Sequence, residues 1–282
     1  MAGQACFFFD VNILLDTVFY KAHDLAGLRH ERGVRGERLE KLLSDIEKYK
    51  IDCFASSSVY SKLSEIVSEV NASIADSARK LICYLREKKK PTSSSSNELS
   101  PFSMKSDIFL IEKFFRDEFR QLSREEEKEG LRRVEYLLVG HLEQALKNHG
   151  ETVRTQEIVS FIENLLVDIN KWSDARNTAM LQIRQDIQEK TIVVDRGLQK
   201  TIKMEFFMSD EDSSHVGSAF QYQTKENTMV IFVSIDYKHI INWQEEIFSK
   251  LKLMCSDPIY AVHHLRHLSE TVGVPRGTSS TR

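Results

Sequence analysis

The sequence predicts an α/β fold in which a parallel β-sheet is flanked by helices, with an all-helical insertion in the middle of the chain. Short apolar runs, at residues 6–9 and 229–233, alternate with longer segments of helical periodicity, a pattern typical of strands and helices that alternate in a parallel sheet. Residues 107–190 show apolar positions almost entirely at helical spacing, which predicts the insertion.

The first ninety residues contain two of the predicted strands. Residues 6–9 are apolar and aromatic and end at Asp10, so we expect a buried strand whose carboxyl end presents an acid. The serines at 56–58 offer hydroxyl groups that cap helices. In chain order we then predict a helix at 13–28, a glycine- and arginine-rich loop, a helix at 37–49, a strand at 51–55, and two helices that begin after 56–58 and at 72.

A serine-rich stretch separates this part from the helical region. Residues 91–103 hold four consecutive serines and two prolines, the composition of a flexible linker. Strands are predicted again at 191–195, 229–233 and 251–255, and Asp257 with Pro258 can begin a closing helix. The predicted organisation is a first sheet-containing part at 1–90, a linker at 91–103, the helical insertion at 104–190, a second sheet-containing part at 191–270 and a disordered tail at 271–282.

The composition indicates a cytoplasmic protein without a membrane span. The longest apolar stretch, residues 6–20, is interrupted by Asp10, Asn12 and Asp16, so it fits neither a membrane-spanning helix nor the core of a signal peptide. The four cysteines lie far apart and form no paired motif, which argues against a zinc site or a disulfide framework and predicts core thiols.

Two acids are predicted to meet at one edge of the sheet. Asp10 and Asp236 each follow a predicted strand, and ligands of open parallel sheets collect beyond the carboxyl ends of the strands. If the two strands are neighbours, the two carboxylates converge. This arrangement is a hypothesis for a metal site, because carboxylate oxygens are the ligands that Mg²⁺ and Mn²⁺ prefer.

Four segments of the chain, residues 8–16 (FFDVNILLD), 56–58 (SSS), 212–219 (DSSHVGSA) and 230–236 (VIFVSID), together resemble the PIN domain family of metal-dependent ribonucleases. Residues 8–16 are similar to the opening strand of the family, and residues 212–219 to its acid-headed helix. Residues 230–236, VIFVSID, resemble its strand closed by a serine or threonine, any residue, and aspartate. The fourth is the serine turn at 56–58, followed by a helix that carries Glu65. The resemblance covers residues 4–90 and 195–268 and implies a PIN-like fold.

The resemblance also implies a site and an activity. Asp10, Glu65, Asp212 and Asp236 would form the catalytic, metal-binding set for Mg²⁺ or Mn²⁺, and a metal-activated water would attack an RNA phosphodiester. Asn12 and Ser234 would hold the acids in place. Two assignments stay open: Lys62 lies one turn before Glu65 at a spacing that the family's acid also fits, and Asp210 is a substitute for Asp212.

Other interpretations of the same residues stay open. Each acid also has a structural role available, since Asp10 and Asp212 can cap helices and Asp236 can stabilise a turn. The alternative function is a catalytically inactive PIN-like module that binds RNA or a protein. The partners considered are RNA, a second copy of the chain, and an inhibitory or docking protein, but no membrane.

Overall fold

The computed structural model describes residues 5–25, 34–90, 99–149, 152–261 and 263–264. The chain divides into two compact units, Met1–Glu65 with Arg176–Arg282 and Ile66–Ala175. The division falls inside two 32-residue helices, α3 (Ser57–Lys88) and α6 (Thr155–Asp186). The first unit holds the main sheet and every candidate site residue.

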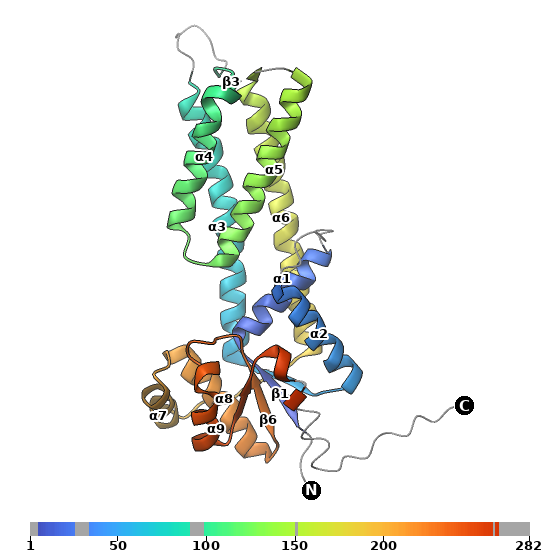
Figure 1. Cartoon of the computed structure of the whole chain (residues 1–282), viewed down its shortest axis with the longest axis vertical. Helices are drawn as coiled ribbons and strands as arrows, with labels where there is room; N and C mark the ends of the chain where they lie inside the picture. The colour runs from blue at the N-terminus through green and yellow to red at the C-terminus, as the bar shows by residue number, and fades with distance from the viewer. Residues whose placement is uncertain (1–4, 26–33, 91–98, 150–151, 262, 265–282) are drawn as a thin grey trace, which may run out of the picture. The chain divides into compact units, whose positions relative to one another are not determined.

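Five parallel strands form the main sheet, which confirms the prediction of a parallel sheet flanked by helices. Their order is β5-β2-β1-β6-β7, with β1 in the centre (Figure 1). The five strands are β1 (Cys6–Phe9), β2 (Cys53–Ser56), β5 (Gln188–Lys190), β6 (Val230–Val233) and β7 (Met254–Ser256).

The central strand is buried on both faces because its side chains alternate between two helical layers. Cys6 and Phe8 join one core cluster with buried residues of α7 (Arg196–Phe206), α8 (Asp210–Glu226) and α9 (Gln244–Leu251). Phe7 and Phe9 therefore point to the opposite face. Helices α1 (Val11–Leu25) and α2 (Val34–Tyr49) connect β1 to β2 and lie on the side of the sheet away from α8 (Figure 1).

The strand order places a topological switch point between β1 and β6. From β1 the chain builds outward through β2 to β5, and it then returns to the other side of β1 and builds outward through β6 to β7. Phe9 pairs with Val233 at the carboxyl end of this strand pair. Asp10 and Ser234 follow directly, so both lie where doubly wound sheets place their ligands.

Several predicted elements differ in the structure. The two helices expected after residue 56 are one continuous helix, α3, because no glycine or proline interrupts Ser57–Lys88. The strand expected at 191–195 lies earlier, at Gln188–Lys190, so the predicted insertion at 104–190 ends inside the main sheet. Helix α1 begins at Val11 instead of residue 13.

The second unit is predominantly helical, but it also contains two short strands, one of them at residues 152–153, inside the insertion that the sequence predicts to be all-helical. It contains α4 (Met104–Gln121), α5 (Glu125–His149) and the adjoining parts of α3 and α6. Its two-residue strands β3 (Phe102–Ser103) and β4 (Thr152–Val153) pair antiparallel. Residues 91–98 of the predicted linker and the predicted tail at 271–282 lie outside the described residues, whereas Phe102 of that linker is fully buried.

The burial of the cysteines and the polarity of the helices test the predictions of core thiols and of no membrane span. Cys6, Cys53 and Cys255 are buried free thiols, and burial raises the pKa of Cys6 to about 12. Cys83, by contrast, is exposed, so the prediction of core thiols is wrong there. Within the described ranges, each helix is too short or too polar to cross a membrane.

Tyr60 tests the packing of the edge strand β5. Its buried hydroxyl donates to the carbonyl of Ile187, 2.7 Å away, immediately before β5. Tyr60→Phe leaves that carbonyl without this donor, so we expect the free energy of unfolding to fall by about 1–3 kcal/mol in urea denaturation. Tyr260→Phe, at an exposed tyrosine, is the control and should shift it by less than about 0.5 kcal/mol. Equal values for the two variants would contradict the role of the hydroxyl.

Candidate metal centre

Asp10 lies fully buried at the end of the central strand, with both carboxylate oxygens hydrogen-bonded. Its Oδ1 accepts from the backbone N–H of Val11 at 2.7 Å and lies 3.1 Å from Nδ1 of His215. Its Oδ2 accepts from the hydroxyl of Ser234 at 2.7 Å and from the amide of Asn12 at 3.3 Å. Four donors compensate for the cost of burying this charge.

His215 is a site residue that the sequence analysis did not single out. It lies on α8 with 3% of its surface exposed, and since a carboxylate oxygen only accepts, its Nδ1–H donates to Asp10. The bond connects α8 to the carboxyl end of β1. A histidine three residues after a candidate acid is a weak signal, because that spacing places any residue one helical turn further along.

Ser234 connects Asp10 to Asp236. Its Oγ donates to Asp10 and accepts from the backbone N–H of Asp236 at 3.0 Å. The Asp236 carboxylate then closes a turn, because its Oδ1 accepts from the backbone N–H of His239 at 2.9 Å. Asn12 and Ser234, which the resemblance assigns to hold the acids in place, both donate to Asp10, and Ser234 also accepts from the backbone of Asp236.

Asp212 lies in the first turn of α8. Ser209 caps this helix: its Oγ accepts from the backbone N–H of Asp212 at 3.0 Å and donates to Oδ2 of Asp212 at 2.8 Å. The Ser209 hydroxyl therefore contacts both the backbone N–H and the carboxylate of Asp212 at the start of the helix. Asp210, the substitute, instead forms an exposed ion pair with Lys203.

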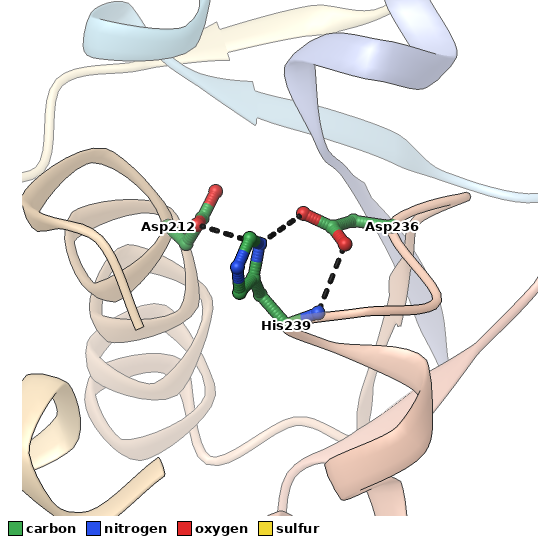
Figure 2. A group of neighbouring side chains, drawn as sticks. All are labelled: Asp212, Asp236 and His239. Atoms are coloured by element: carbon green, nitrogen blue, oxygen red, sulfur yellow. Dashed lines mark hydrogen bonds and ion pairs between the residues drawn. The ribbon is translucent and has the colours of Figure 1, made fainter. Parts of the chain in front are cut away.

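Asp212 and Asp236 come together around His239. Figure 2 shows the imidazole between the two carboxylates, with Nδ1 lying 3.1 Å from Oδ2 of Asp236 and 3.8 Å from Oδ2 of Asp212. The three residues offer ligand atoms within 4.8 Å of one another, and no other such group of three occurs in the ranges that the structure describes. Their side chains are 18%, 19% and 34% exposed for Asp212, Asp236 and His239, so solvent reaches them.

Glu65 lies outside this group. Its carboxylate is 52% exposed and pairs with Lys62 at 3.2 Å. Lys62 also reaches Glu211 at 3.0 Å, so its ammonium joins α3 to the first turn of α8. Hydrogen bonds to Glu211 and to Glu65 raise the pKa of Lys62, and the lysine remains a cation.

The donor set fits a small divalent cation. Two carboxylates from separate elements face one partly open position, and each accepts a hydrogen bond from its own turn or cap residue. Such a pair is sufficient for ions that keep several waters. Asp10 differs, because its four donors leave it enclosed.

Comparison with protein-family models, with curated proteins and with solved structures finds no match to this chain.

A substitution at Ser234 tests the hydrogen-bonded connection between Asp10 and Asp236. Removing its hydroxyl takes a charge-assisted donor from Asp10 and the acceptor from the Asp236 backbone. For Ser234→Ala we expect the free energy of unfolding to fall by about 1.5–3 kcal/mol, measured by urea denaturation.

The control for this variant is Ser218→Ala. Ser218 is also fully buried, but its hydroxyl donates to the carbonyl of Ser214 in its own helix. It should therefore change stability by less than about 0.5 kcal/mol. If the Ser234→Ala protein is as stable as Ser218→Ala, the Ser234 hydrogen bonds do not contribute to stability as proposed.

Proposed function

We propose that the chain is a divalent-metal-dependent hydrolase that cleaves phosphodiester bonds in single-stranded or structured RNA. The observation that supports this function most is the convergence of Asp212 and Asp236, with accessible oxygens, at the switch point of a parallel sheet. The resemblance of residues 8–16, 212–219 and 230–236 to PIN domains supplies the substrate class.

The two acids would hold the ion, Mg²⁺ or Mn²⁺. When bound, such an ion lowers the pKa of a coordinated water and stabilises the charge that develops on a phosphate. Asp212 and Asp236 would bind the ion, and the placement of their carboxylates depends on neighbouring serines. Ser209 fixes the first acid at the start of α8, and Ser234 fixes the turn that carries the second.

Asp10 acts in this proposal as a positioning residue. Its carboxylate accepts from Ser234 beside Asp236 and from His215 one turn after Asp212. It therefore sets the separation of the two elements that present the acids. A site held on rigid elements keeps its geometry without reorganising when substrate binds.

A second candidate function is a non-catalytic PIN-like module that binds RNA or protein. The observation that favours it is the pairing of Lys62 with Glu65 and Glu211. The Lys62 ammonium neutralises two carboxylates, those of Glu65 and Glu211, that would otherwise be available to a metal ion. The module would keep the fold and lack the complete acidic set.

Cleavage of an end-labelled single-stranded RNA distinguishes the two functions. We expect cleavage with Mn²⁺ or Mg²⁺ and none with EDTA, and we expect Asp236→Asn to lower the rate by about a hundredfold or more, because it removes a carboxylate from the ion. Asp168→Asn, at an exposed acid paired with Lys171 in the second unit, is the matched control. Binding of RNA without metal-dependent cleavage of any of several substrates would favour the module.

Glu65 tests whether the acidic set needs a fourth member. Because Glu65 is half exposed and paired with Lys62, we expect Glu65→Gln to change the cleavage rate by less than about tenfold, against the larger loss in Asp212→Asn. Rates are compared at saturating metal in proteins with matched circular dichroism. If Glu65→Gln is as inactive as Asp212→Asn, Glu65 belongs to the metal-binding set and the exclusion drawn from the geometry is wrong.

A further inference from the structure

We propose that His239 is a nitrogen ligand of the ion held by Asp212 and Asp236, and that the site consequently selects Mn²⁺ or another transition ion, such as Co²⁺ or Zn²⁺, over Mg²⁺. This inference rests on the proposed metal site and specifies its chemistry. It adds a ligand that neither the strand pattern nor the resemblance assigns.

The turn after β6 aims the imidazole at the acid. The backbone N–H groups of Ile240 and Ile241 donate to the carbonyl of Asp236 at 3.1 and 2.9 Å. This tight turn brings His239 back over the carboxylate, where Oδ1 is occupied by the backbone N–H of His239. Oδ2 remains on the side of the ring, 3.1 Å from Nδ1.

The same nitrogen also faces the acid from the other element. Nδ1 lies 3.8 Å from Oδ2 of Asp212, on α8, so one nitrogen and two oxygens from separate parts of the chain border one position (Figure 2). Ligands of one ion with metal–ligand bonds of about 2.0–2.2 Å lie roughly 3 Å or slightly more apart. The separation of Nδ1 from Oδ2 of Asp236 matches that value, and its separation from Oδ2 of Asp212 exceeds it by less than 1 Å.

The second histidine of this region, His215, is buried and shows a different arrangement. His215 has a side chain 4% exposed and donates to Asp10, whose side chain is 1% exposed. His239 is 34% exposed and its acids are 18–19% exposed. One imidazole is thus enclosed with a fully bonded carboxylate, while the other lies where an ion and its waters have access.

The nitrogen determines which ions fit. Mg²⁺ is bound almost entirely by oxygen, whereas an imidazole nitrogen adds affinity for first-row transition ions, least for Mn²⁺ and more for Co²⁺ and Zn²⁺. A ligand set of two carboxylates and one imidazole therefore favours transition ions. Without an ion, Nδ1–H of the same ring would donate to Asp236, and the experiment must separate these two roles.

Pulsed electron paramagnetic resonance of Mn²⁺ added to the 282-residue chain distinguishes these two roles. We expect a ¹⁴N coupling from a directly bound imidazole, and we expect it to disappear in His239→Asn. Titration calorimetry should show the Mn²⁺ affinity of His239→Asn reduced by at least about tenfold. The Mg²⁺ affinity, which does not depend on nitrogen, should change less. His263→Asn, at an exposed histidine outside the site, should leave all three measurements unchanged.

Two results would overturn the inference, and they differ in what they imply for the proposed function. Bound Mn²⁺ without nitrogen coupling in the wild-type protein, and with equal affinity in His239→Asn, removes His239 from the ligand set and leaves the carboxylate site intact. Absence of binding by Mn²⁺, Co²⁺, Zn²⁺ and Mg²⁺ in a folded wild-type protein removes the metal site itself. The wild-type spectrum gives this answer even if His239→Asn does not fold.

Discussion

The carboxylate of Asp10 is buried at the end of the central strand, and the hydrogen bonds that it accepts come from three separate parts of the first unit. Val11 and Asn12 follow it along α1, His215 belongs to α8, and Ser234 follows β6. A buried carboxylate with fewer donors would be costly. The arrangement of these elements is therefore coupled to one charge, and the positions of Asp212 and Asp236 depend on it.

Strong local patterns made most of the fold predictable. The aromatic run before Asp10 and the β-branched run before Ser234 identified β1 and β6, because buried central strands are almost wholly apolar. The edge strand β5 was predicted too late in the chain, at 191–195, because Gln188–Lys190 is polar and mostly exposed, so it has no hydrophobic signature. Its position is fixed by pairing with β2, a contact that no local pattern records.

The site was predictable to the extent that it follows from strand ends. Two acids after two parallel strands were expected at one edge, and the pairing of Phe9 with Val233 puts them there. The two histidines were missed because the local sequence does not record their contacts. His239 reaches Asp236 through a turn that brings it back to an acid three residues earlier, and His215 contacts an acid at the end of a distant strand. Glu65 was assigned by resemblance, whereas its surroundings depend on Lys62 and Glu211, which converge only in three dimensions.

The pairing of β1 with β6 joins residues from nearly opposite ends of the chain, and this affects how the protein is made. The bond between Ser234 and Asp10 spans 224 positions and that between His215 and Asp10 spans 205. At ribosomal speeds of about 5–20 residues per second, Asp10 waits roughly 10–45 s for its last donor. During that interval the aromatic segment Cys6–Phe9 lacks its neighbour β6. An apolar strand without its neighbour favours aggregation, so the nascent chain carries that risk until residue 230 has been synthesised.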